Sequence, residues 1–231
     1  KEQRDNLDVL NQFLRHDIRN DLQLVIAYAE ILAKNVDEES LEAVDTVRES
    51  AQHAVELTTT ARDMADVMLT DDDGQQPVNL RATLESELDE IRSAYADAVV
   101  TVDETLPDSS VRADKMLDSV FRNLLKNAIQ HNDKDLPKVT VSVADRGESV
   151  RVRIADNGPG VPDDQKTAIF GKGEKGLESS GTGLGLFLVK SLVDSYGGDV
   201  WVEDAGAMEQ SQSHTSGTAG AVFLVELPKA E

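Results

Sequence analysis

A repeating pattern of apolar residues near the amino terminus is the feature that most constrains the fold. Apolar side chains recur at spacings of three and four residues along one stripe: Leu7, Leu10, Leu14, Ile18, Leu22, Val25, Ala29 and Leu32. This period predicts a long amphipathic helix over about residues 5–35. A partial second stripe runs beside it through Phe13, Leu24, Ala27 and Ile31. A helix with two apolar flanks is typical of a bundle.

A second helix with the same spacing follows after a turn at residues 35–40. Its apolar positions are Leu41, Val44, Val47, Ala51, Ala54, Val55, Leu57, Ala61, Met64 and Met68. The two helices predict an antiparallel hairpin about 45 Å long. Such a hairpin is too thin to bury both apolar flanks, whereas two copies can form a four-helix bundle. We therefore expect a homodimer.

The remainder of the chain mixes helix and strand patterns. Helices are expected over residues 80–95, 114–131 (capped by Asp114) and 184–196, and strands over residues 99–102, 110–112, 138–143, 150–155, 199–203 and 219–227. The fold class is therefore α+β: a helical hairpin followed by an α/β sandwich with helices on one face of a mixed sheet. The expected domains are residues 1–70 and 79–231, joined by a polar linker at 71–78.

The charge excludes some partners. The 231 residues carry a net charge of −21, spread along the whole chain, and contain no cysteine. Such a surface repels nucleic acid and anionic lipid and is typical of adaptation to high salt, which screens self-repulsion. No run approaches the roughly 18 apolar residues of a membrane span. Because the sequence opens on Lys1 rather than Met, we expect it to be a piece of a longer protein with an upstream sensor.

A polar patch lies on the first helix, on the side opposite its apolar stripe. His16 and Asp17 are adjacent, and Asn20 lies one turn further on, so an imidazole, a carboxylate and an amide share one side. By itself the patch is also consistent with an ordinary solvated histidine, which is how we interpret His53 and His214.

Three further stretches carry potential chemistry. In the helix expected over residues 114–131, Asn123 and Asn127 lie one turn apart beside Lys126, and His131 ends it. Amide oxygens suit Mg²⁺, which also binds phosphate oxygens.

Asp156-Asn157-Gly158-Pro159-Gly160 follows a strand, where a carboxylate can accept from an exocyclic amine and the glycines let the backbone approach a flat ring. Gly181-Thr182-Gly183-Leu184-Gly185 opens a helix whose free amides favour phosphate. It lacks the βαβ context of a dinucleotide-binding fingerprint.

In this order and spacing, the three stretches resemble the asparagine box and the two glycine boxes of the Bergerat-fold ATPases. With the His16 hairpin ahead of them, nearly the whole chain resembles the transmitter core of a two-component sensor histidine kinase. Gly217-Thr218, Phe223 and Leu227-Pro228 match the family's closing strand. Combined with the charge, the resemblance indicates a haloarchaeal source.

The resemblance implies a role for each matching residue. His16 would be the phosphoacceptor, Asp17 would orient its ring and take its proton, and Asn20 would place water for dephosphorylating the partner regulator. Asn127 would bind Mg²⁺ with support from Asn123. The remaining ATP-binding positions would be Lys126, His131, Asp156, Gly158, Gly160, Phe170, Lys172, Gly181, Thr182, Gly183, Leu184, Gly185 and Thr218. Residues 161–180, with Phe170 as an apolar latch, would form a mobile lid over ATP.

The implied activity is ATP-dependent autophosphorylation of His16, then transfer to an aspartate of a separate response regulator, in the cytoplasm or on a membrane-anchored full-length protein. Two features depart from the family: Asp21 stands where proline is common, and the loop 207–217 is long. Three alternatives remain open: a scaffold without kinase activity, an ATPase clamp, and a transmitter that acts mainly as a phosphatase. Asn127, Asp156 and the three glycines of the last box are intact, which argues against the scaffold, and the His16-Asp17 pair argues against the clamp.

Overall fold

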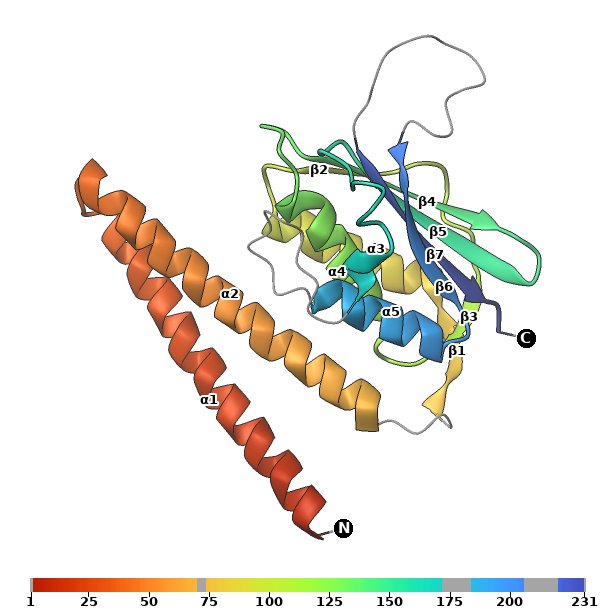
Figure 1. The fold of residues 1–231 in the computed structure, drawn as a ribbon, viewed down its shortest axis with the longest axis horizontal. Helices are drawn as coiled ribbons and strands as arrows, with labels where there is room; N and C mark the ends of the chain where they lie inside the picture. The colour runs from red at the N-terminus through yellow and green to blue at the C-terminus, as the bar shows by residue number, and fades with distance from the viewer. Residues whose placement is uncertain (1, 70–73, 172–183, 206–219, 231) are drawn as a thin grey trace. The chain divides into compact units, whose positions relative to one another are not determined.

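The computed structural model describes residues 2–69, 74–171, 184–205 and 220–230, with the side chains of 2–17, 38, 39, 56, 62 and 64–69 excepted (Figure 1). The chain divides into two compact units, Lys1–Ala65 and Asp66–Glu231. No helix among the described residues is long and apolar enough to cross a membrane.

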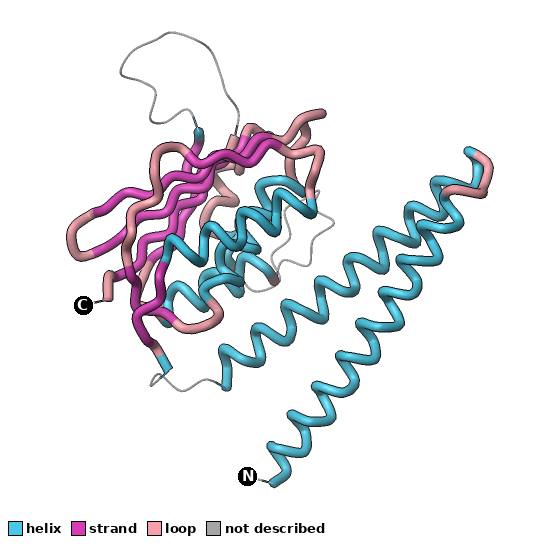
Figure 2. Tube along the Cα trace, turned by 180° about the vertical axis from the view of Figure 1, so that it is seen from behind, coloured by secondary structure: helices cyan, strands magenta, loops and turns pink. Residues whose placement is uncertain are grey.

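The first unit is the expected helical hairpin. Helix α1 (Glu2–Ala33) and helix α2 (Glu38–Leu69) lie side by side in both views (Figures 1 and 2). Side chains satisfy backbone groups at both ends of the short connection. Asn35 Nδ2 donates to the Ile31 carbonyl at 2.7 Å, and Asp37 accepts from the Ser40 amide at 3.0 Å, which caps α2.

The hairpin buries only part of its apolar surface. Ala29 and Ala51 are buried, whereas these large apolar side chains are exposed: Ile18, Leu24, Val25, Tyr28, Ile31, Leu32 and Val47. Among the side chains that the structure describes, the hairpin by itself therefore leaves many apolar positions uncovered. The solvated position expected for His53 is wrong: the residue is half-buried, and its Nε2 is buried without a hydrogen-bond partner among the described residues.

The second unit is built on a five-stranded mixed sheet. The strand order is β2 (Val99–Val102), β4 (Lys138–Asp145), β5 (Ser149–Asp156), β7 (Ala221–Pro228), β6 (Asp199–Asp204). The β2–β4 pair is parallel and the other pairs are antiparallel. The hairpin of β4 and β5 confirms the period-two pattern of the sequence.

Helices cover one face of this sheet and complete the expected sandwich (Figure 2). Helix α4 (Leu117–Gln130) packs against both α3 (Leu80–Ala94) and α5 (Gly185–Ser195). On β5 the buried residues Val150, Val152 and Ile154 alternate with half-buried ones, as a strand with one covered face requires. The α+β fold class is thereby confirmed.

Two local features differ from expectation. Gln76–Asn79 forms strand β1, antiparallel to β3 (Ser110–Ala113), so the expected linker 71–78 ends in a strand. Helix α4 begins at Leu117 and not at Asp114. The Asp114 carboxylate instead accepts from the Met116 amide at 2.8 Å and from the Tyr196 hydroxyl at 2.5 Å, which ties the start of α4 to the end of α5.

Candidate active site

Asp156 ends strand β5 and is held by backbone amides. Its Oδ1 accepts from Gly158 N at 2.8 Å and from Ala221 N at 3.2 Å, so a turn and strand β7 both fix the carboxylate. Burial raises the pKa of Asp156, and the two amide donors oppose that rise. No hydrogen bond from the described part of the chain reaches Oδ2. The arrangement can therefore present one oxygen to an incoming amine.

Glycines form the wall around this carboxylate. A Cβ on Gly158 would lie 3.0 Å from Asp156 Oδ1. Gly160 has a φ of +80°, a backbone conformation that residues other than glycine rarely adopt. Gly220 is the tightest position, because a Cβ there would lie 2.2 Å from the Asp156 carbonyl oxygen. The sequence expectation included Gly158 and Gly160 but missed Gly220 and the Ala221 amide. Only the pairing of β5 with β7 reveals their proximity to Asp156.

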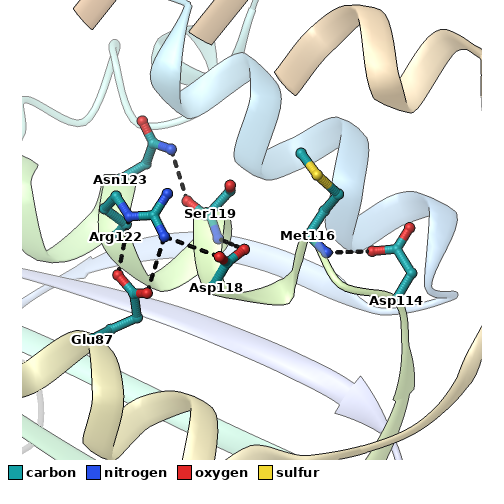
Figure 3. A network of polar contacts seen from close by, with 7 residues as sticks. All are labelled: Glu87, Asp114, Met116, Asp118, Ser119, Arg122 and Asn123. Atoms are coloured by element: carbon teal, nitrogen blue, oxygen red, sulfur yellow. Dashed lines mark hydrogen bonds and ion pairs between the residues drawn. The ribbon is translucent and has the colours of Figure 1, made fainter. Parts of the chain in front are cut away.

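Helix α4 brings the amide side chains to the start of α5. Asn123 Nδ2 donates to the Ser119 carbonyl at 2.7 Å (Figure 3), and this bond directs Oδ1 toward α5. A Cβ on Gly185 would lie 2.8 Å from that oxygen, so a side chain at this position would displace the Asn123 amide. Asn127 and Lys126 follow on the same half-buried surface of α4.

An ion-pair network fixes α4 against α3 (Figure 3). The Arg122 guanidinium donates twice to the Glu87 carboxylate, at 3.1 and 3.0 Å, and once to Asp118 at 3.0 Å. Glu87 is almost fully buried, with 4% of its side chain exposed. Burial raises the pKa of Glu87, and Arg122 counteracts this. Asn123, the next residue in the sequence, therefore lies on a part of α4 that this network holds against α3.

Three other expected site residues lie at the ends of helices. His131 is exposed at the C-cap of α4, and Leu184 precedes α5. Phe170, the expected apolar latch of residues 161–180, ends the 3₁₀ helix η2 (Ala168–Phe170), is only 9% exposed and lies edge-on to Phe223 at 6.4 Å. It packs into the core because the preceding turn carries the chain back onto the sheet.

Several expected residues lie outside the described residues: Lys172, Gly181, Thr182, Gly183 and Thr218. The same is true of the His16 and Asp17 side chains, although both residues belong to α1. Asn20 is exposed on α1.

The donor set fits a magnesium nucleotide better than a dedicated metal cage. Among the described residues there is no group of three or more His, Cys, Asp or Glu side chains that could hold a metal. The Asn123 amide oxygen of α4 lies beside Gly185, which has no side chain at the first turn of α5. Mg²⁺ commonly takes one or two protein ligands and completes its shell with phosphate oxygens and water.

Two family matches cover most of the chain. Residues 113–231 match the family described as histidine kinase-, DNA gyrase B-, and HSP90-like ATPase, and residues 7–69 match the His Kinase A (phospho-acceptor) domain.

Curated relatives agree with these matches. The chain is 25% identical over 224 residues to sensor protein KdpD of Escherichia coli, covering 94% of this chain and 24% of that protein. It is 28% identical over 209 residues to sensory histidine kinase/phosphatase NtrB of Rhodobacter capsulatus, covering 84% of this chain and 58% of that protein. The chain thus spans between about a quarter and three fifths of the length of these two relatives.

Solved structures show the same architecture. Full-length ShkA in complex with AMPPNP is 25% identical with a TM-score of 0.61, covering 96% of this chain and 46% of that one. The catalytic domain of histidine kinase ThkA is also 25% identical, with a TM-score of 0.56 over 67% of this chain and 97% of that one. The chain belongs to the histidine kinase-, DNA gyrase B- and HSP90-like ATPase family and has a His Kinase A domain before its ATPase domain, which is the arrangement of a sensor histidine kinase transmitter core.

Proposed function

We propose that this chain phosphorylates His16 with ATP and passes the phosphoryl group to an aspartate of a separate response regulator. The observation that carries the proposal is the amide-held carboxylate of Asp156, in an ATPase domain that follows a phospho-acceptor helix containing His16. A carboxylate with one oxygen saturated by backbone amides is suited to accept from the 6-amino group of adenine.

The nucleotide contacts follow from the same geometry. Asp156, with the wall of Gly158 and Gly160, would bind adenine, and Asn123 with Gly185 would lie near the phosphates. Asn127 would bind Mg²⁺, which supplies charge neutralisation on the phosphates when bound. The remaining phosphate and ribose contacts are proposed from the family pattern: Lys126, His131, Lys172, Gly181, Thr182, Gly183, Leu184 and Thr218. Phe170 is proposed as the apolar latch of residues 161–180.

The transfer step uses His16 as the nucleophile. A ring nitrogen forms a bond to the γ-phosphorus while the bond from that phosphorus to the bridging oxygen of ADP breaks. Asp17 takes the proton that leaves the other ring nitrogen, so phosphohistidine remains neutral at the ring. The phosphoryl group then moves to the regulator's aspartate. Asn20, one turn along α1, would position water for hydrolysis of the phosphorylated regulator.

The exposed apolar flanks of the hairpin support a homodimer. Leu24, Ile31 and Leu32 are each more than half exposed in one chain, and a second hairpin would cover them in a four-helix bundle. Residues 1–70 would then serve dimerisation and phosphotransfer, and residues 79–231 catalysis.

The charge and the relatives suggest the cellular setting. A net charge of −21 supports a halophilic, haloarchaeal source. The greater length of the relatives supports an upstream sensor domain in the full-length protein. We place the core in the cytoplasm, with the full-length protein free or membrane-anchored.

Incubation with γ-labelled ATP and Mg²⁺ in molar KCl tests the proposal. Acid-labile, base-stable label is expected on the wild type and on neither His16→Gln nor Asn127→Ala. Label that persists on His16→Gln would place the acceptor elsewhere. An unlabelled wild type that still binds ATP would favour the scaffold or phosphatase alternatives.

A further inference from the structure

Two asparagine side chains join the end of α4 to the turn after β5. Asn132 Nδ2 donates to Asn157 Oδ1 at 2.9 Å, across 25 residues of sequence. Asn132 follows the C-cap of the helix that carries Asn123 and Asn127, and Asn157 directly follows Asp156. The bond therefore spans the two halves of the candidate site, the amide helix and the carboxylate wall.

Each member of the pair is fixed by further bonds. Asn157 Oδ1 also accepts from the Lys138 amide at 2.8 Å, and Asn157 Nδ2 donates to the Leu136 carbonyl at 3.3 Å. Asn132 Oδ1 accepts from the Lys134 amide at 3.1 Å. A side chain with both its oxygen and its nitrogen engaged has one orientation, so the pair is a rigid connection.

Asn132 also lies close to Gly158 in the glycine wall. A Cβ on Gly158 would lie 3.4 Å from both Asn132 Cα and Asn132 Cγ, as well as 3.0 Å from Asp156 Oδ1. Gly158 is thus enclosed between Asn132 and the carboxylate to which its amide donates. A shift of Asn132 would be transmitted to the Gly158 amide, and through that amide to Asp156 Oδ1.

We propose that Asn132 and Asn157 are positioning residues that hold Asp156 at the distance and orientation needed to select the 6-amino group of a purine nucleotide. They act through Gly158 and the β4–β5 end, without touching the nucleotide themselves. The inference deepens the proposed function and rests on it, because it concerns how the proposed ATP site discriminates among bases.

The test compares two nucleotides that differ only at the amino group. Binding of ATP and of purine riboside 5′-triphosphate, which lacks the 6-amino group, is measured by calorimetry with Mg²⁺ on the full 231-residue chain. Asn132→Asp is the main variant, because it keeps the shape and the acceptor for Lys134 but removes the donor to Asn157. Asn132→Ala is the second variant, and Gln130→Ala is the control, since it removes another α4 amide bonded at 3.0 Å to the Tyr95 hydroxyl.

The wild type should prefer ATP by about tenfold, since a hydrogen bond to a charged acceptor is worth roughly that factor. Both Asn132 variants should lower this preference to about twofold even where their melting temperatures fall, because the ratio compares two nucleotides on the same variant, whereas general damage would weaken both nucleotides equally. An unchanged preference in a folded Asn132 variant overturns the inference and leaves the ATP site intact. A wild type without any preference instead overturns the adenine contact of Asp156, and this inference with it.

Discussion

The ion pair between Glu87 and Arg122 makes a quantitative prediction about stability. Replacing Arg122 with Ala leaves the Glu87 carboxylate, 4% exposed, without its bidentate partner at 3.0 and 3.1 Å. Breaking a fully buried pair by removing one partner costs about 3–5 kcal/mol. Because the Arg122 side chain is 29% exposed and Glu87 can take up a proton, we expect a loss of about 2–3 kcal/mol at pH 7.

The loss should depend on pH in a defined direction. Burial already raises the pKa of Glu87, and Arg122 is the group that lowers it. Without Arg122 the folded-state pKa rises further, so the folded variant binds a proton more readily than the unfolded chain does. Its free energy of unfolding therefore falls as pH rises from the unfolded-state pKa of Glu87 through the raised folded-state pKa, and it recovers as pH falls back through that range; above the raised pKa this group adds no further pH dependence.

Urea denaturation at fixed salt, followed at several pH values, checks this. Glu87→Gln in the Arg122→Ala background should recover part of the loss at pH 7, because it removes the uncompensated charge. Arg81→Ala is a matched control, since its pair with Glu85 at 2.8 Å is exposed and should contribute less than about 1 kcal/mol. An Arg122→Ala variant that is as stable as this control at pH 7 would refute the reasoning. So would a stability difference from the wild type that grows as pH is lowered from 7 toward the unfolded-state pKa of Glu87.

Three further predictions concern the wall of the site and helix α3. Gly220→Ala should sharply weaken ATP binding and lower the melting temperature, because the new Cβ would lie 2.2 Å from the Asp156 carbonyl; unchanged affinity by calorimetry would contradict the packing. The ratio of the affinity for ATP to that for the triphosphate lacking the 6-amino group should fall on acidification. Because burial raises the pKa of Asp156, this fall should begin at a higher pH than it would for an ordinary aspartate. A ratio that stays constant down to about pH 4 would argue against the raised pKa. Asn79→Ala should cost about 1 kcal/mol in urea denaturation by removing the cap on the Ala82 amide at 2.9 Å, and a neutral result would mean that water replaces the cap.

Local patterns predicted most of the fold because each long element has a clear period. The hairpin helices and the β4–β5 pair follow directly from spacings of three to four and of two. Strand β1 was missed because its four residues contain a proline and a single half-buried position, and only pairing with β3 makes them a strand. The cap predicted at Asp114 is wrong because its partner Tyr196 lies 82 residues away, beyond the reach of a local pattern.

Some residues of the candidate site can be recognised from short sequence motifs, whereas others matter only through contacts with distant parts of the chain. Asp156, Gly158 and Gly160 form one short motif, and Asn123 and Asn127 another, so sequence alone could identify them. Gly220 and Asn132 matter only through contacts with a distant strand or turn, and no local pattern distinguishes them. The burial of Phe170 against Phe223 likewise depends on how the turn folds back onto the sheet.

The most direct test of the central claim is to locate the phosphoryl group. The full chain is incubated with ATP and Mg²⁺ in molar KCl, digested at alkaline pH, and analysed by mass spectrometry under conditions that preserve phosphohistidine. The account predicts one phosphate, on the peptide that contains His16, and none on the same peptide of His16→Gln. A phosphate on any other residue, or an unmodified His16 peptide from a chain that binds ATP, would contradict it.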